Sequence, residues 1–395
     1  MTPRRLRGML AALCLATFLA SASGIVLSPY LRAIAQDFAT DLAASANLLT
    51  YVAIAWGITA MVAGAISDRL GRRALLIIGI LVMAVASVGF ALAHEYLTAA
   101  LWRGLTGVGG GIFMGTVFAA VADHIPSEAR GRALGWVITG QSLALVLGVP
   151  LFTWLGAFGG WRGAMIAHGA LGLVTALGIA VLVPADPAKH SATGARRAPL
   201  RVIWKAPLLT LLGASITERL CFATAAVYLA TFLQESYGVS LAALAIGLGF
   251  VALGNLAGNV LGGFIADRFR ARPLVFATSS AVTAVLALPL LLWNGGLALS
   301  LILGFAYSLA NSLGRPALMA TLSEVPREVR GTVLGLNSTM ASIGWIGASA
   351  LGGWLLTRFG FASLGVFCAL ASGLGTLLAL AHWRLRRVAA PAHQL

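Results

Sequence analysis

Apolar runs of about 20 to 26 residues recur along the whole chain, and they limit its fold more than any other feature. Hydrophobic residues make up 59% of the 395 residues and charged residues only 10%, whereas a soluble domain has roughly 25% charged residues. The solvent for most of this chain is therefore lipid. In hydrocarbon an unsatisfied backbone group costs several kcal/mol, so only α-helices and closed β-barrels can span it.

The apolar runs predict helices rather than strands. They show no alternation of apolar and polar residues, and each is long enough as a helix to cross a hydrocarbon core of about 30 Å. We therefore predict an all-α membrane protein with twelve transmembrane helices. Their expected ranges are 8–36, 44–66, 74–93, 97–122, 131–156, 162–183, 208–235, 241–265, 273–293, 297–321, 331–356 and 361–383.

The start of the chain allows a second interpretation. The stretch "MTPRRLRGMLAALCLATFLASASG" has a basic head, an apolar middle and small residues, which also describes a signal peptide. We favour a transmembrane helix, because the internal repeat described below needs one here. The three cysteines, Cys14, Cys221 and Cys368, fall in predicted helices and form no metal or disulfide pattern, so we interpret them as small buried hydrophobes.

The distribution of the net charge of +15 indicates topology rather than nucleic-acid binding. Of the 27 Lys and Arg, 21 fall in the two tails and in alternate loops. Short loops rich in Lys and Arg stay in the cytoplasm, so both termini are expected there, in a bacterial-type inner membrane. The same excess attracts anionic lipid. The exceptions lie at opposite helix ends (Arg32, Arg162, Arg358) or within predicted helices (Arg103, Arg219, Arg315).

An internal repeat divides the chain into two halves. "GAISDRLGRRALLI" from Gly64 resembles "GGFIADRFRARPLVF" from Gly262, and "IPSEARGRALG" resembles "VPREVRGTVLG" 200 residues later. "YLRAIAQD" from Tyr30 likewise matches "YLATFLQE" from Tyr228, 198 residues on. We predict two pseudo-symmetric six-helix bundles, at 1–183 and 207–395, joined by a polar cytoplasmic linker at 184–206.

Two six-helix halves around a cavity are one of the main transporter architectures, with substrate bound near the midplane. A scaffold without a cavity is the structural alternative. The sequence has neither a phosphate loop for ATP nor a His-Glu-x-x-His zinc pair, so we expect no enzyme activity, no cofactor and no metal. Transport would then draw its energy from a gradient.

Several motifs resemble those of the major facilitator superfamily. "GAISDRLGRR" is similar to its cytoplasmic signature, and "RGLTGVGGG" from Arg103 is similar to a motif of its proton-coupled members. "SPYLRAIAQDF" and "GGWRGAM" resemble the drug:proton antiporter branch. "GQSLALVLGVPLFTWLG" matches the antiporter motif only in part, since its usual Gly-Pro pair is Gly148-Val149-Pro150 here. Gly148 and Pro150 also predict a bend.

The resemblance implies a latch that closes the cytoplasmic side. Asp68 would accept hydrogen bonds from the start of the predicted helix 331–356 near Gly331, where the helix dipole favours an anion. Arg72 would pair with Asp123. Arg69 and Asp267 complete the set of gating residues, and the second copy, which has lost a glycine, is expected to latch more weakly. The alternative is a basic turn that only fixes topology.

Glu218 and Arg219 stand side by side in the predicted helix 208–235. Glu218 is eleven residues after Pro207, or roughly 16 Å along a helix, and it is the one deep carboxyl among the twelve Asp and Glu. Successive helical residues point about 100° apart, so we expect that the pair cannot face each other squarely. Burial favours the neutral carboxyl and a guanidinium favours the charged one, which suits a group that binds and releases a proton.

Arg103 is the third candidate for proton coupling, on the resemblance of its motif, and contacts to backbone carbonyls are its structural alternative. A buried ion pair that only joins helices is the alternative for Glu218 and Arg219. Polar side chains that could line a substrate cavity are Tyr30, Gln141, Tyr228, Asn255, Tyr307, Asn311 and Arg315. His168 could carry protons, but a structural histidine is the simpler interpretation.

These features predict a monomeric secondary transporter that works by alternating access. The expected function is proton-coupled export of small amphipathic molecules, such as drugs or metabolites. One alternative is an importer or facilitator of an anionic metabolite that uses Arg103, Arg219 and Arg315. A lipid flippase or sensor is the other. The sequence does not identify the substrate.

Overall fold

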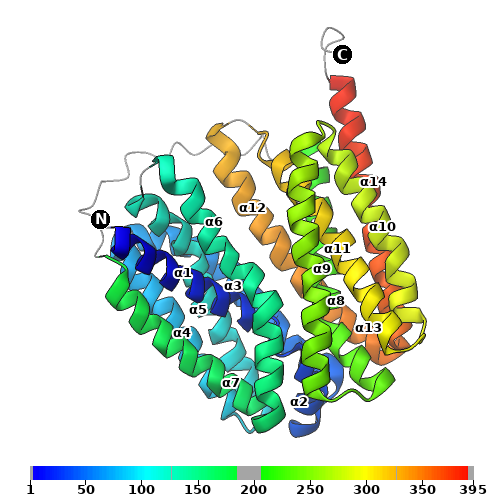
Figure 1. Cartoon of the computed structure of the whole chain (residues 1–395), viewed down its shortest axis with the longest axis horizontal. Helices are drawn as coiled ribbons and strands as arrows, with labels where there is room; N and C mark the ends of the chain where they lie inside the picture. Colours follow the sequence, from blue (N-terminus) through cyan, green and yellow to red (C-terminus); the bar gives the residue numbers. More distant parts are fainter. Residues whose placement is uncertain (1–2, 126, 185–205, 326, 390–395) are drawn as a thin grey trace. The chain divides into compact units, whose positions relative to one another are not determined.

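Helices form every regular element in the part of the chain that the structure describes, as lipid requires. The structure is a computed structural model that describes residues 3–125, 127–184, 206–325 and 327–389. It leaves undescribed the side chains at 3–4, 64–65, 68–69, 122, 127–132, 327–332, 334–335 and 387–389. Figure 1 shows the elements in sequence colours.

The chain divides into two units, each with its own set of packed helices. Unit 1 comprises Met1–Ala195 with Ser240–Gly249, and unit 2 comprises Arg196–Val239 with Phe250–Leu395. The predicted linker, 184–206, lies almost entirely in residues 185–205, outside the described residues. The predicted domain boundaries therefore stay predictions.

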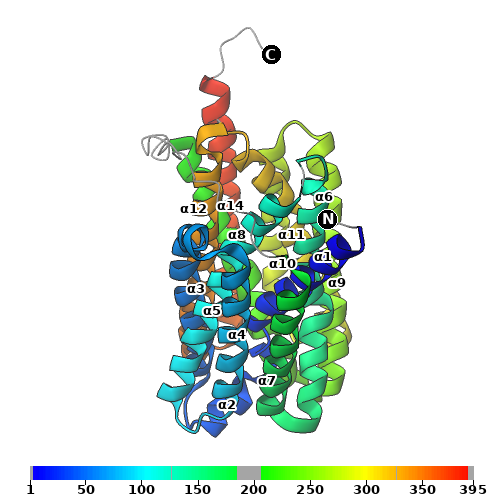
Figure 2. The same cartoon turned by 90° about the vertical axis from the view of Figure 1, so that its left-hand side faces the viewer.

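Unit 1 is built around α5, which packs against α3 and α4 (Figure 2), while α7 packs against α4. Its elements are α1 Pro3–Ser23, η1 Ser28–Tyr30, α2 Leu31–Asp37, α3 Leu42–Leu70, α4 Arg72–Ala91, α5 Tyr96–His124, α6 Ser127–Leu143, η2 Ala144–Gly148 and α7 Val149–Leu182.

Unit 2 is built around α8 and α10. Helix α10 packs against α14 and α11, and α8 packs against α14, α12 and α11. Its elements are α8 Ala206–Tyr237, α9 Leu241–Arg268, α10 Arg272–Leu292, α11 Leu297–Leu322, α12 Arg327–Ile346, η4 Gly347–Leu351, α13 Gly352–Phe359 and α14 Phe361–Ala389. The first residues of α9, through Gly249, are grouped with unit 1.

The described helices are sufficient for the twelve membrane crossings that the sequence predicts, because the longest apolar segment contains two of them. Eleven described segments are long and apolar enough to span, and the longest, Ala133–Leu182, has 50 residues. A straight helix of that length would measure about 75 Å, far more than one crossing needs. The backbone breaks at Gly160, whose φ of 63° and ψ of −169° fall in a region used essentially by glycine alone. Gly360 makes the same break between α13 and α14, with φ 73° and ψ −176°.

The first predicted crossing, 8–36, coincides with the apolar segment Arg5–Asp37, but it is not one continuous helix. Helix α1 ends at Ser23, and a short 3₁₀ turn containing Pro29 precedes α2. Pro29 lies in the first turn of η1, and it does not explain the break alone, because Pro289 and Pro316 lie inside α10 and α11. The equivalent helix of unit 2, α8, carries its only proline in its first turn and runs without interruption.

A π-helical turn interrupts one long helix in each unit. Segment η2 lies between α6 and α7, and η4 lies between α12 and α13. The η2 turn ends at Gly148, two residues before Pro150, where the missing N–H and the proline ring disturb regular helix geometry. No proline lies near η4, so the two units reach the same irregularity from different sequences.

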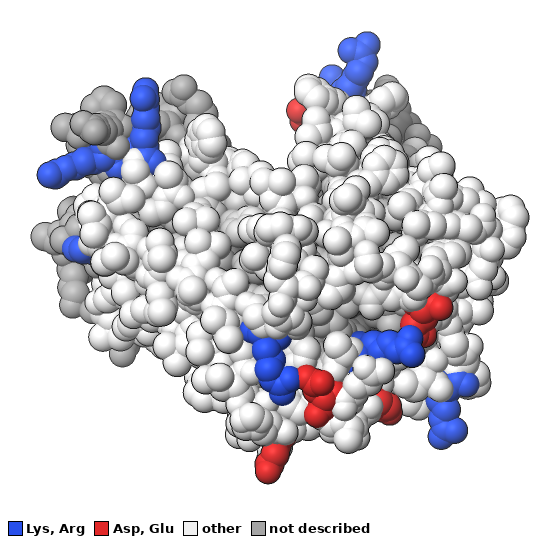
Figure 3. Space-filling model, turned by 60° about the horizontal axis from the view of Figure 1, so that its bottom comes forward, with Lys and Arg blue, Asp and Glu red and all other residues white. Residues whose placement is uncertain are grey.

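The charged side chains visible on the molecular surface occur in a few groups. Figure 3 shows Lys, Arg, Asp and Glu in such groups, with broad areas of other residues between them. Large apolar side chains such as Met61, Phe158, Val181 and Ile246 are more than 70% exposed. Such exposure suits a surface whose solvent is lipid.

Candidate functional site

A buried ion pair lies on α8. Arg219 donates from Nε to Oε2 of Glu218 at 2.6 Å, and its Nη2 donates to Oε1. Only 3% of the Glu218 side chain and 8% of the Arg219 side chain are exposed. The expectation that these neighbours cannot face each other is therefore wrong. Their Cβ directions diverge, but the flexible arginine stem is long enough to bring its planar head back onto the carboxylate.

The surroundings of Arg219 hold it tightly. Its guanidinium carbon lies 4.5 Å from the centre of the Phe222 ring, a cation–π distance. Helix α12 passes so close that a methyl group at Gly344 would lie 2.7 Å from Cβ of Arg219. Only glycine fits at that crossing.

Helix α11, which packs against α8, carries three polar side chains on one face. Tyr307, Asn311 and Arg315 are four residues apart, so they share one face of the helix. The Tyr307 hydroxyl donates to the backbone carbonyl of Cys221 on α8 at 2.9 Å. Arg315, which is half-buried, lies close enough to Arg219 and Glu218 for their charges to act on it.

This group of five side chains, Glu218, Arg219, Tyr307, Asn311 and Arg315, is named the α8–α11 cluster here. Among the described residues, Arg315 makes no ion pair and the buried Oδ1 of Asn311 accepts no hydrogen bond. The cluster thus has one positive charge in excess and one unused acceptor. Charges at membrane depth usually face a partner or a water-filled cavity, so these groups are suited to a ligand.

Arg103 lies in unit 1, on α5, and is 1% exposed. Its Nη2 donates to the carbonyl of Ser23 at 2.9 Å, and its Nε donates to the carbonyl of Leu48 at 3.4 Å. Ser23 is the last residue of α1, whose C-terminal carbonyls have no helical partner and attract a cation. Arg103 makes no ion pair within the described residues. These contacts fit its structural alternative, and its part in proton coupling stays a prediction.

Two tyrosines donate to backbone carbonyls in or near the π-helical turns. The hydroxyl of Tyr30 donates to the carbonyl of Phe152 at 2.5 Å, and that of Tyr228 donates to the carbonyl of Ser349 at 2.6 Å. Ser349 lies within η4, and Phe152 lies four residues after the end of η2. Both tyrosine side chains are buried, at 2% and 1% exposure. Their hydroxyls are therefore engaged with backbone, and contact with substrate stays untested.

The predicted gate is described in part. The side chains of Asp68, Arg69 and Gly331 lie outside the described residues. Arg72, at the start of α4, donates from Nε to Asp123 at 2.9 Å, which is the ion pair that the sequence predicts. Its gating role stays a prediction.

Unit 2 contains a counterpart of this ion pair that the sequence analysis missed. Arg272, at the start of α10, donates to Glu324 at 2.9 Å, and Arg386 of α14 binds the other carboxylate oxygen. These residues follow Arg72 and Asp123 by 200 and 201 positions, a spacing that could have revealed them. Asp267 is exposed and makes no ion pair with any residue that the structure describes.

The remaining polar candidates do not join the cluster as a group. Asn255 of α9 is buried and donates to the Ser312 hydroxyl. Gln141 of α6 is half-buried in unit 1. His168 is buried, with Nδ1 3.0 Å from the Ser87 hydroxyl and Nε2 3.1 Å from the Leu19 carbonyl, which fits a structural histidine. Among the described residues no three His, Cys, Asp or Glu side chains group as metal ligands would.

The chain is similar to known transporters over most of its length. A family model described as Major Facilitator Superfamily matches residues 13–349 and 214–394. The chain is 28% identical to the uncharacterized MFS-type transporter YwfA of Bacillus subtilis, covering 93% of this chain and 90% of the relative. It is 27% identical to the inner membrane transport protein YdhP of Escherichia coli, covering 88% and 89%. It is 25% identical to the quinolone resistance protein NorA of Staphylococcus aureus, covering 77% and 79%.

Solved structures share the fold. A bacterial homolog of the human lysosomal transporter Spinster, in an inward-facing and unoccupied conformation, has a TM-score of 0.79 and 17% identity, covering 99% of this chain and 96% of the other. A D-xylose-proton symporter has a TM-score of 0.78 and 20% identity, covering 95% and 97%. The chain belongs to the major facilitator superfamily, and it is a multi-pass membrane transporter.

Proposed function

We propose that the protein exports small amphipathic molecules in exchange for protons, by alternating access. The observation that carries the proposal is Glu218, the one buried carboxylate among the described residues, at the centre of the α8–α11 cluster. The relative named for quinolone resistance supports export of amphipathic molecules. The structural neighbour named as a proton symporter supports coupling to protons.

The chemistry of Glu218 allows protons and substrate to exclude one another. A charged Glu218 accepts hydrogen bonds, from Arg219 or from donor groups of a substrate that displaces it. A proton on Glu218 removes much of that acceptor capacity. Alternating access would bring Glu218 into contact with water and substrate from each side of the membrane in turn.

An anion transporter is the second candidate, and the absence of an ion-pair partner for Arg315 among the described residues favours it. A proton on Glu218 would release Arg219, and two guanidinium groups could then hold a carboxylate or phosphate. Proton and anion would bind together, so this route predicts co-transport. A facilitator would show no dependence on a pH gradient.

The remaining features follow from the sequence. We place both termini in the cytoplasm, because the Lys and Arg residues gather in the loops on that side. We expect a monomer in an inner membrane, with a small molecule and protons as its ligands.

The direction of coupling separates the candidates. A thermal-shift screen of purified protein against quinolones, amphipathic cations and organic anions would first supply a substrate. Flux is then measured in proteoliposomes with imposed pH gradients. An exchanger accumulates the substrate when the lumen is acidic, and a co-transporter accumulates it when the outside is acidic. Equal flux under both gradients would contradict proton coupling.

A further inference from the structure

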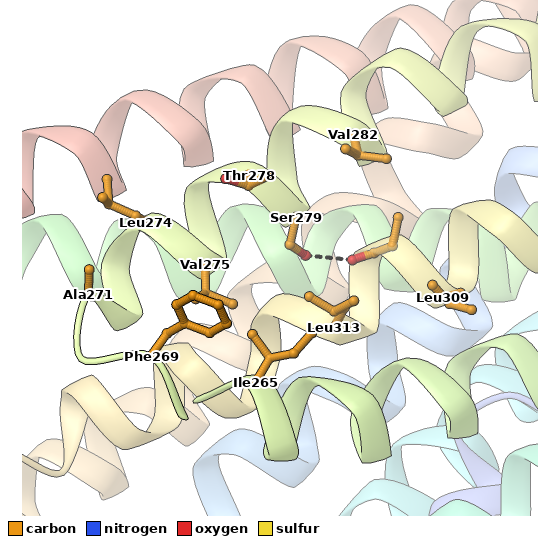
Figure 4. Close-up of a pocket in the computed structure, with 11 residues that line it drawn as sticks. Ile265, Phe269, Ala271, Leu274, Val275, Thr278, Ser279, Val282, Leu309 and Leu313 are labelled. Carbon is orange, nitrogen blue, oxygen red and sulfur yellow. Dashed lines mark hydrogen bonds between the residues drawn. The ribbon is translucent and has the colours of Figure 1, made fainter. Parts of the chain in front are cut away.

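Unit 2 contains an apolar groove that the transport site does not use. It has a volume of about 470 Å³ and lies between the end of α9, the start of α10 and the middle of α11. Figure 4 shows side chains from all three helices, among them Ile265, Val275, Val282 and Leu313, and Phe269 from the α9–α10 connection. Its volume is in the range of roughly 300–1,000 Å³ that is usual for ligand pockets.

The lining of the groove fits hydrocarbon rather than a polar solute. Its hydroxyl groups are those of Thr278 and Ser279. Ser279 already donates to the carbonyl of Ala310 at 2.5 Å, the dashed line in Figure 4. Phe269 and Val282 are 57% and 45% exposed, so the groove opens to the outside of unit 2. In a membrane that outside is lipid.

The contacts of α9 define the floor of the groove. A methyl group at Gly262 would collide with the carbonyl and Cα of Leu313 on α11. The two backbones therefore touch at this level, as small residues allow in membranes. One turn later, Ile265 carries a large side chain, and Ile265 and Leu313 line the groove together. The close approach of α9 and α11 at Gly262 thus positions the side chains of Ile265 and Leu313 that form the floor of the groove.

Two cations are the sequence neighbours of Phe269, a residue that lines the groove. Arg268 and Arg270 flank Phe269 in the sequence, and both side chains are exposed. Neither makes an ion pair with a described residue. Arg272, by contrast, is held by Glu324 and by the carbonyl of Ala266. The acidic side chain nearest in sequence is the single Asp267, so residues 267–270 keep a net positive charge.

The second of these cations is absent from the other half of the repeat. Aligning Asp68 with Asp267 places Gly71, the turn between α3 and α4, at the position of Arg270. Gly71 has a φ of 95°, which favours glycine. Unit 2 makes its α9–α10 connection without such a glycine and carries Arg270 at this position, while Ala271 stands where unit 1 has Arg72.

We propose that this groove binds an anionic phospholipid. One acyl chain lies along Ile265, Phe269, Val275 and Val282, and the headgroup phosphate contacts Arg268 and Arg270. Guanidinium groups bind phosphate oxygens through paired N–H donors. A phospholipid fits because its apolar acyl chain matches the groove and its anionic headgroup matches the two arginines. The site is separate from the α8–α11 cluster, so the proposal does not depend on the transported substrate.

Native mass spectrometry of the full-length protein in detergent tests the site. Phosphatidylglycerol and phosphatidylethanolamine with identical acyl chains are the probes, and the dissociation constant of each is measured. Wild type is expected to bind phosphatidylglycerol roughly tenfold more tightly, because only that lipid carries a net negative charge. Replacing both cations, Arg268→Ala with Arg270→Ala, should remove the preference. Thr278→Trp, which fills the groove, should weaken binding of both lipids.

The control variant carries Arg5→Ala and Arg7→Ala, which remove two exposed arginines of α1 in unit 1. It should keep the full preference for phosphatidylglycerol. An equal loss in this control would overturn the proposal, because it would show attraction to total charge alone. An unchanged preference after removal of Arg268 and Arg270, or unchanged binding in the Thr278→Trp variant, would also overturn it. Displacement of the lipid by inorganic phosphate alone would show that the groove adds nothing.

Discussion

Arg219 binds both carboxylate oxygens of Glu218, its immediate neighbour on α8. The ion pair is complete within one helix, so it can move with α8 without being broken. Such a buried pair seldom stabilises a fold, because the hydration free energy that the two charges lose on burial usually exceeds the free energy that their attraction returns. For this reason we propose a role in the transport cycle for the pair.

Removal of one partner should destabilise the protein more than removal of both. Arg219→Gln leaves a buried carboxylate without its cation, and we expect a loss of about 3–5 kcal/mol in the free energy of unfolding. The double variant Glu218→Gln with Arg219→Gln should recover most of that loss. Chemical unfolding in detergent measures both. A double variant as unstable as the single one would show that the arginine acts by packing rather than by pairing.

Arg103 should stabilise the protein by its hydrogen bond to the Ser23 carbonyl at the end of α1. Arg103→Leu leaves the Ser23 carbonyl without its charged donor, for an expected loss of roughly 1.5–3 kcal/mol. Arg103→Lys keeps a cation beside that carbonyl and should lose less. Hydrogen exchange at residues 20–30 reports the same effect locally. If both variants unfold like wild type but lose proton coupling, the residue belongs to the coupling machinery and not to the α1 support.

The hydroxyls of Tyr30 and Tyr228 should contribute similar amounts to the free energy of unfolding. Tyr30→Phe and Tyr228→Phe each remove one hydrogen bond to a backbone carbonyl and keep the ring, so each should cost about 1–3 kcal/mol. Amide exchange should rise near the matching π-turn: η2 for Tyr30 and η4 for Tyr228. Loss of substrate binding with unchanged exchange would instead mark these residues as part of a substrate cavity.

The two arginine–carboxylate pairs at the helix ends should affect transport more than stability. Both pairs are partly exposed, and the carboxylates of Asp123 and Glu324 are 41% and 33% exposed. Such pairs contribute roughly 0–1 kcal/mol. Arg72→Gln and Arg272→Gln should therefore unfold near wild type while they change the flux, with the larger change in Arg72→Gln if the second latch is the weaker one. Wild-type flux in both variants would argue that these residues only fix topology.

Much of the fold follows from sequence because lipid leaves few choices. The lengths of the apolar runs give the twelve crossings, and the repeat of "GAISDR" as "GGFIADR" gives the two halves. The Arg72–Asp123 pair follows from placing each charge at a helix end. The break before Pro29 does not follow from the proline alone, because Pro289 and Pro316 lie inside continuous helices.

Other features depend on side-chain geometry that spacing does not encode. Helical periodicity separates Glu218 and Arg219, but the long arginine stem overcomes that separation. The π-turn at η4 has no proline to mark it. The groove beside Phe269 depends on how closely α9 meets α11, which only the packed structure reveals.

The most direct test of the central claim compares Glu218→Gln with Glu95→Gln, an identical change at an exposed residue before α5. Each variant is reconstituted with wild type as reference, and uptake of the same substrate is followed with an acidic lumen. We predict that Glu218→Gln, which mimics the protonated side chain, binds substrate more weakly and loses accumulation driven by the pH gradient, while Glu95→Gln accumulates like wild type. Full proton-driven accumulation by Glu218→Gln would contradict the account.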